Sequence, residues 1–169
     1  IRSSIGSRGE ILDSASVELA RIRRSIGSNR QSLRRELEQM FGDERLTGVF
    51  QDQLVTERNG RYVVPVKADF RGKLKGFVHD ASATGQTLFV EPAAALERNN
   101  ALQQLLQNEA IEERRILQAL SDALMVDEAE ILINQEVVVH LDLRCATARF
   151  SRKCDASVPH LVEEPLVDL

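Results

Sequence analysis

The chain has 169 residues, of which 43% are hydrophobic, and this is enough material for one domain or for two small interlocked ones. Aromatic residues make up only 4% and tryptophan is absent, so the composition favours long helices packed along a seam over a thick globular core. The net charge is −4, so the chain as a whole gives no reason to expect nucleic acid, and the distribution of charge matters more than its sum.

Neither a membrane span nor a secretory signal is expected. No run of about 18 apolar residues occurs, and the N-terminus lacks an apolar core segment. If Cys145 and Cys154 share a helix, their side chains point to opposite faces, because nine positions at roughly 100° each turn the second by about 180°. We therefore expect reduced thiols and a cytoplasmic location. The chain begins with Ile1 and not with methionine, which favours a segment of a longer protein, with processing as the alternative.

A long amphipathic helix is predicted from residue 17 to about residue 41. Residues 13–16 offer N-cap candidates, and Gly42 ends the pattern. Apolar residues recur every three or four positions and form a narrow stripe, which suits one neighbouring helix. The stripe consists of Leu19, Ile22, Ile26, Leu33, Leu37 and Met40.

Residues 43–91 change character, with glycines separating short runs rich in Val, Thr, Tyr and Phe. The pair Asn59-Gly60 tolerates the positive φ angles of a tight hairpin turn. Pro65 cannot donate to a β-ladder, so its strand should have an open side there. We predict two hairpins with four short antiparallel strands, at residues 54–58, 61–67, 74–79 and 87–91.

Helical periodicity returns at Pro92. A proline is compatible with this position, since proline is favourable in the first turn of a helix. A break is expected near residues 126–127, followed by another helix to about Cys154. Residues 157–169 should be extended, since they contain Pro159 and Pro165.

The predicted fold class is therefore α+β, mainly α. Long antiparallel lever helices (residues 1–42 and 92–169) carry a small four-stranded antiparallel β clamp (residues 43–91) inserted between them. A helix of about 25 residues extends roughly 37 Å, so the sheet should lie at the far end of the helices.

Positive charge is concentrated in the predicted β insertion. Between residues 58 and 75 there are six basic residues and one acid, Asp69. Such a cluster neutralises phosphates and gives salt-sensitive, sequence-tolerant binding to nucleic acid. The alternative is that these charges only protect the edges of an exposed sheet, and charge alone leaves both interpretations open. The basic residues are Arg58, Arg61, Lys67, Arg71, Lys73 and Lys75.

The expected topology assigns these residues to different positions. We expect the first strand to run away from the helices, so that the turns at residues 59–60 and 83–85 are distal and the loop at 69–72 returns to the helices. Lys67, Lys73 and Lys75 would then lie further down the faces of the sheet. The predicted distal contacts to phosphate oxygens, with Asn59 in the turn itself, are Arg58, Arg61, Ser82, Thr84 and Gln86.

No catalytic or metal site is predicted. His79, Asp80 and Ser82 supply the residue types of a hydrolase triad, but adjacency in sequence is not the required geometry, and a turn with side-chain hydrogen bonds is the preferred interpretation. The histidines and cysteines have no metal-ligand spacing, and no glycine-rich loop ends in Lys-Ser or Lys-Thr. We expect no enzymatic activity and no cofactor in these residues.

Longer motifs are found in residues 58–67 (RNGRYVVPVK) and 72–92 (GKLKGFVHDASATGQTLFVEP). They resemble the clamp region of the second bacterial branch of MutS-like proteins, the MutS-two family. Residues 10–16 (EILDSAS) and 18–23 (ELARIR) resemble the lead into that family's lever helix. Leu141-Asp142 and residues 146–149 (ATAR) resemble the helix before its ATPase domain.

The resemblance implies a lever-and-clamp module of a homodimeric ATPase that closes around branched or duplex DNA and suppresses homologous recombination. Family members often carry a C-terminal Smr endonuclease domain. Some act on stalled or collided ribosomes, so an arm that docks on rRNA or ribosomal protein is the alternative. ATP and Mg would belong to an ATPase domain of the parent, because this chain has no nucleotide motif. A third possibility is that the clamp binds only as a dimer.

Overall fold

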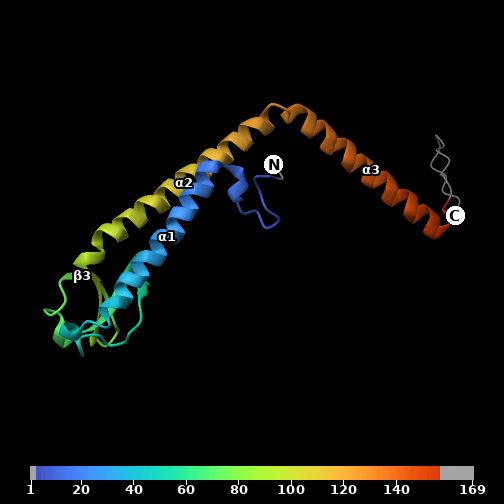
Figure 1. Cartoon of the computed structure of the whole chain (residues 1–169). Coiled ribbons are helices and arrows are strands. Elements are labelled where there is room, and N and C mark those ends of the chain that lie inside the picture. The colour runs from blue at the N-terminus through green and yellow to red at the C-terminus, as the bar shows by residue number, and fades with distance from the viewer. Residues whose placement is uncertain (1–2, 157–169) are drawn as a thin grey trace. The chain divides into compact units, whose positions relative to one another are not determined.

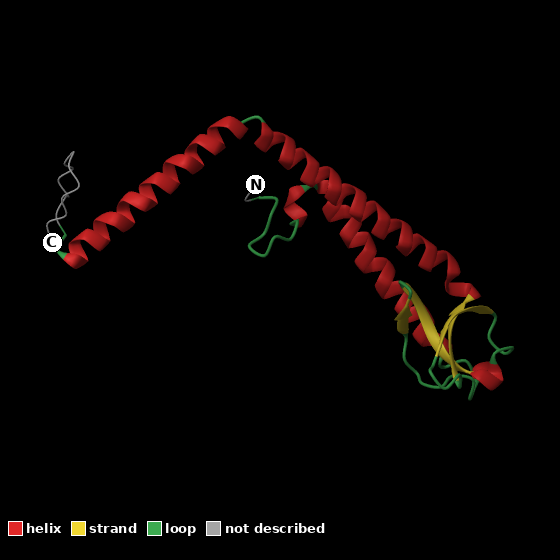
Figure 2. Ribbon diagram, turned by 180° about the vertical axis from the view of Figure 1, so that it is seen from behind, coloured by secondary structure: helices red, strands yellow, loops and turns green. Residues whose placement is uncertain are grey.

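The computed structural model describes residues 3–156, which fall into two compact units, Ile1–Leu120 and Ser121–Leu169. In the first unit α1 (Val17–Met40) and most of α2 (Leu96–Met125) run side by side with a β-sheet at one end (Figures 1 and 2). The second unit begins within the last turns of α2, at Ser121, and contains α3 (Glu128–Cys154). The fold is α+β and mainly α, as predicted. The segment at residues 157–169, expected to be extended, lies outside the described residues.

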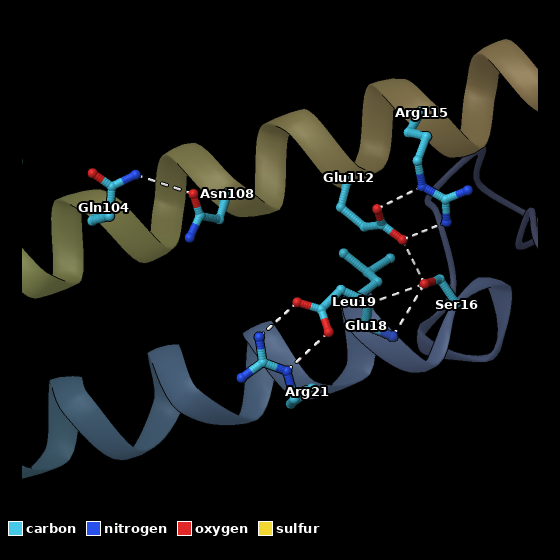
Figure 3. Close-up of polar contacts among 8 residues, drawn as sticks. All are labelled: Ser16, Glu18, Leu19, Arg21, Gln104, Asn108, Glu112 and Arg115. Atoms are coloured by element: carbon cyan, nitrogen blue, oxygen red, sulfur yellow. Dashed lines mark hydrogen bonds and ion pairs between the residues drawn. The ribbon is translucent and has the colours of Figure 1, made fainter.

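Ser16 caps the start of helix α1: its side-chain oxygen accepts hydrogen bonds from the backbone N–H groups of Glu18 and Leu19. The same hydroxyl donates to Glu112 of α2, which also holds Arg115 (Figure 3). The bonds from Arg115 and Ser16 lower the pKa of Glu112 to about 2. The N-terminal cap of one helix is thus fastened to the other helix.

Ion pairs at both ends fix α1 antiparallel to α2. Near the start of α1, the guanidinium of Arg23 contacts Asp13, Glu109 and Glu113, each at 2.7 Å. These carboxylates, Asp13 first, raise the pKa of Arg23. Near its end, Glu36 lies 2.6 Å from Arg98, at the beginning of α2. The apolar stripe predicted for α1 is buried at Leu19, Ile22, Ile26, Leu33 and Leu37.

The sheet has four antiparallel strands in the order β1-β2-β4-β3. Asn59 (φ 53°) and Gly60 (φ 75°) form the predicted tight turn. Among the described residues no strand lies beside Pro65 on the β1 side: β1 stops opposite Val63, and the N–H of Gln51 donates to the Pro65 carbonyl. The strands are β1 (Thr56–Arg58), β2 (Arg61–Lys67), β3 (Gly76–Ala81) and β4 (Thr87–Pro92).

Four short 3₁₀ helices occupy the connections. The one that matters most for the site is η4 (Ala93–Ala95), because it is the entire link between β4 and α2. The others are η1 (Asp13–Ala15), η2 (Glu44–Leu46) and η3 (Ala68–Phe70).

One face of the sheet packs on the adjoining ends of α1 and α2 to form the core. Leu33 and Leu37 of α1 and Leu102 of α2 are almost wholly buried. They share one apolar cluster with side chains from the sheet and its loops, namely Val49, Val64, Val66, Leu74 and Val90. The sheet is therefore a packed extension of the two helices. The division into a clamp at 43–91 and levers on either side stays a prediction.

In the second unit, helix α3 has no buried residue, and Asp155, which follows its last residue, adopts the left-handed conformation (φ 50°). Among the described residues, no helix combines the length and the apolar character needed to cross a membrane.

Candidate nucleic-acid interface

The turn at Asn59-Gly60 lies against α2. The side chain of Gln103, two turns into α2, donates a hydrogen bond to the Gly60 carbonyl. The expectation that this turn is distal is therefore wrong. The physical reason is the strand order: β4 is an inner strand that runs into α2, and its antiparallel pairing with β2 brings the start of β2 to the helix as well.

The free end of the sheet is the opposite one. There Lys67 pairs with Thr87, and the N–H of Ala68 donates to the carbonyl of Gln86. The 69–72 loop, expected near the helices, starts at this end, whereas the turn at 83–85 is distal as expected. Lys67, expected further down the sheet, is also at the free end. A hollow of about 450 Å³ opens there, lined by Gln51, Lys67, Ala68, Asp69, Thr84, Gly85 and Gln86.

The guanidinium of Arg61 is engaged inside the protein. It lies 2.7 Å from a carboxylate oxygen of Glu91, which is 1% exposed, and it donates to Asn100 at 2.8 Å. The other carboxylate oxygen of Glu91 contacts His79 Nε2 at 2.5 Å. This buried carboxylate bridges Arg61 and His79 and holds Arg61 at the junction between sheet and helix.

Asn99 of α2 is fully buried and binds the backbone of β2 with both ends of its carboxamide. Its oxygen accepts from the Tyr62 N–H at 3.0 Å, and its Nδ2 donates to the Tyr62 carbonyl at 3.1 Å. Neither Asn99 nor Glu91 was among the predicted site residues. The available signal is a polar residue within the apolar stripe of α2, since Asn99 stands between Ala95 and Leu102, both buried.

Arg58 and Asn59 face the outer surface of the sheet near the bulge in β3. The Arg58 guanidinium lies 4.2 Å above the Phe89 ring and 3.4 Å from the Asp80 carboxylate. The side chain of Asn59 donates to the His79 carbonyl. Arg58 remains partly exposed, so its charge is shared between an internal partner and solvent.

The predicted local hydrogen bonds are present at Asp80 and Ser82, but His79 and Asp80 lie in strand β3 and only Ser82 is in the turn that follows it. The Ser82 hydroxyl accepts from the N–H of Thr87, and the Asp80 carboxylate accepts from the N–H of Ala81. The ring of His79 contacts Glu91. The three side chains stabilise the local backbone and the sheet–helix junction.

The remaining cations follow the connection from η3 to β3. The N–H of Arg71 donates to Ala68 at the free end, while the carbonyl of Lys75 accepts from Ala93 beside α2, so the segment spans the sheet from end to end. Arg71, Lys73 and Lys75 are exposed. Within residues 3–156 neither these three side chains nor Lys67 forms an ion pair. The structure thus brings Lys67, Thr84 and Gln86 together and separates them from Arg58 and Arg61.

Comparison with known proteins gives whole-chain matches. Over all 169 residues the chain is 41% identical to proteins named Endonuclease MutS2 from Bacillus mycoides, Bacillus thuringiensis and Bacillus cereus. The chain spans 22% of the length of each of these relatives. No family model matches it.

Proposed function

The chain belongs to the MutS2 family, and on that premise we propose that it is a non-catalytic lever and clamp whose sheet holds the backbone of branched or duplex DNA. ATP hydrolysis with Mg, dimerisation and any strand cleavage are assigned to the parent protein, outside these residues. Suppression of homologous recombination would be the outcome of the parent's closure around DNA.

The free end of the sheet is the observation that carries this proposal. Lys67 has no ion pair within the described residues and lines one hollow with Thr84 and Gln86. An unpaired cation beside neutral donors suits phosphate oxygens, because the charge supplies affinity and the donors supply orientation. Arg71 and Lys73 extend the same charge along the neighbouring loop.

Arg61 takes a different role in this proposal. Its guanidinium already binds Glu91 and Asn100, and contact with a phosphate would require breaking a bond to a buried carboxylate. Breaking such a bond leaves a buried charge without its partner, which is costly. We therefore assign DNA contact to Lys67, Arg71, Lys73, Lys75, Thr84 and Gln86, with Arg58 at the margin.

The test is a charge-matched pair of double variants. Lys67→Gln with Lys73→Gln removes two cations near the free end, and Arg24→Gln with Arg30→Gln removes two exposed cations from α1. Binding to a DNA junction, a duplex and an rRNA fragment is measured by fluorescence anisotropy over a range of salt concentrations. We expect the first variant to bind more weakly and to reduce the salt slope by about 0.9 for each phosphate that it no longer neutralises.

The α1 variant should keep both affinity and slope. Equal losses in the two variants would mean that only net charge matters, and the assignment of the free end would fail. A preference for the rRNA fragment over both DNA forms would favour the ribosomal arm. If the single chain binds none of the three, the same series on a chain dimerised by an added coiled coil tests whether two clamps are needed.

A further inference from the structure

The sheet has an outer face, opposite its apolar core, on which two phenylalanines lie. Val90 of β4 belongs to the core, so its neighbours Phe89 and Glu91 point to the opposite face, because successive side chains of a strand alternate. Across the sheet, Phe77 of β3 pairs with Glu91, and Asp80 pairs with Phe89. Side chains of paired residues lie on the same face, so Phe77 and Phe89 share this outer face.

Phe77 leaves most of its ring in solvent. Its exposed fraction is 57%, whereas the other phenylalanines in the described part of the first unit are at least partly buried. Strand β3 is the last strand of the sheet, and within residues 3–156 no further strand covers its open side. This ring is therefore free to contact a partner, and aromatic residues are enriched at such contacts.

Arg58 presents a second flat surface on the outer face. Its guanidinium carbon lies 4.2 Å from the centroid of the Phe89 ring, and the Asp80 carboxylate, 3.4 Å from Arg58 Nε, holds it there. The side chain of Arg58 is 39% exposed, so part of the guanidinium remains open to solvent. Aromatic rings and guanidinium planes are the surfaces on which proteins stack unpaired bases.

Positive charge lies next to Phe77 in the chain. Lys73 and Lys75 are exposed, and neither forms an ion pair within the described residues. Single-stranded nucleic acid requires this combination, because cations follow its backbone while rings hold its bases. An apolar protein surface would bury these charges without partners, which is unfavourable. An acidic protein surface would use the charges but has no need of the flat stack of Arg58 on Phe89.

We propose that the outer face of the sheet, formed by Phe77, Phe89 and Arg58, stacks unpaired bases of single-stranded DNA of the kind that a gap or a branch point exposes. The inference rests on the proposed function, since it requires DNA to reach the sheet, and it adds a second contact to it. The free end holds the backbone, and the outer face holds bases. Bases inside a continuous duplex are unavailable until they leave the stack, so this face gives a preference for DNA with unpaired nucleotides.

The test uses two DNA probes with the same number of phosphates. Both are duplexes interrupted by a short single-stranded gap, which carries thymine bases in one probe and abasic nucleotides in the other. Fluorescence anisotropy at low salt measures the affinity of the 169-residue chain for each probe. Because the backbone charge is identical, the ratio of the two affinities reports contact with bases. We expect the thymine gap to bind at least about fivefold more tightly.

Two variants remove the flat surfaces one at a time. Phe77→Ala deletes the exposed ring, and Arg58→Lys keeps the charge but loses the planar guanidinium. Each should weaken binding to the thymine gap by about fivefold and leave binding to the abasic gap unchanged. The matched control is Ile111→Ala, which removes an apolar side chain of α2 that is 65% exposed and should change neither affinity.

Equal binding of the two probes by the wild-type chain would overturn the inference. An unchanged ratio in both Phe77→Ala and Arg58→Lys, or an equal loss in Ile111→Ala, would overturn it as well. Lys67→Gln on a continuous duplex examines the free end separately. If Lys67→Gln weakens duplex binding while the base preference is missing, only the outer face fails. If Lys67→Gln has no effect while the base preference is present, the outer face is supported and the free-end assignment fails.

Discussion

The carboxamide of Asn99 replaces a backbone partner that Pro92 cannot supply. The pairing of β2 with β4 runs from Lys67↔Thr87 to Val64↔Val90 and then stops. Two positions further, the same register would place Tyr62 opposite Pro92, which has no N–H to donate. Asn99 offers one acceptor and one donor at this point and binds both backbone groups of Tyr62. The sheet is thereby continued by a side chain of the helix.

Replacing Asn99 by alanine should lower the free energy of unfolding by about 2–3 kcal/mol, because buried N–H and C=O groups of Tyr62 lose their partners. Chemical denaturation measures the change. Asn100→Ala is the control, since it removes an exposed neighbour whose side chain, within residues 3–156, bonds to Arg61 alone, and it should cost less than about 1 kcal/mol. Equal losses of unfolding free energy in the two variants would show that the contact of Asn99 with Tyr62 stabilises the fold no more than the exposed contact of Asn100 does.

Arg61 shows the limit of reasoning from charge along the chain. The sequence places it in a basic segment beside a tight turn, and that pattern predicts a phosphate contact. Its partner Glu91 lies thirty positions away, and nothing local indicates that this acid of β4 is buried. The pairing depends on the tertiary arrangement, so sequence patterns identified the cluster but not which of its members are free.

Strands β3 and β4 leave no room for a side chain at Gly76. This residue pairs with Pro92, where β4 ends and the link to α2 begins. A Cβ added at Gly76 would overlap the carbonyl oxygen of Glu91 and would press on the Val90 side chain. Because the first of these atoms belongs to the backbone, it cannot move aside without shifting the strand.

The variant Gly76→Ala should therefore destabilise the chain by about 2 kcal/mol or more, as overpacked sites do. Gly72→Ala is its matched control. A Cβ at Gly72 meets no atom within 4 Å, and reduced freedom of the unfolded chain should leave stability unchanged or raise it by up to about 1 kcal/mol. Thermal unfolding followed by circular dichroism separates the two. A neutral Gly76→Ala would mean that the strands can move apart without cost.

The individual elements were largely predictable, because each depends on a local pattern. The three-and-four spacing in α1, the Asn59-Gly60 turn and the break before α3 all appear where they were expected. What local patterns do not determine is how two hairpins join. The β2–β4 pairing is a long-range choice that places β4 inside the sheet, and this one pairing decides which end of the clamp is free.

The core of the molecule lies entirely in the first unit. All of the described buried residues fall between Leu19 and Ile116, and α3 contributes none. Since burial of apolar surface is the dominant favourable term in folding, the stability of the sheet and of the α1–α2 pair should not depend on α3.

A fragment of residues 1–125 should therefore unfold cooperatively with the same midpoint as the 169-residue chain. A shorter fragment of residues 1–108 tests the other direction. It lacks the buried Ile116 and also Glu109, Glu112 and Glu113, which bind Arg23 and Ser16 near the start of α1, and its midpoint should fall by at least about 5 °C. A lower midpoint in the 1–125 fragment would mean that the second unit stabilises the first.

The link between β4 and α2 leaves no room for a hinge. It consists only of η4, whose Ala95 is wholly buried. The hydrogen bonds from Asn99 and Gln103 also hold the β1–β2 turn and the start of β2 against the same helix. The sheet is therefore rigidly attached to α2. A rotation of α2 about its own axis should turn the sheet with it and displace Lys67 and its neighbours at the free end of the sheet.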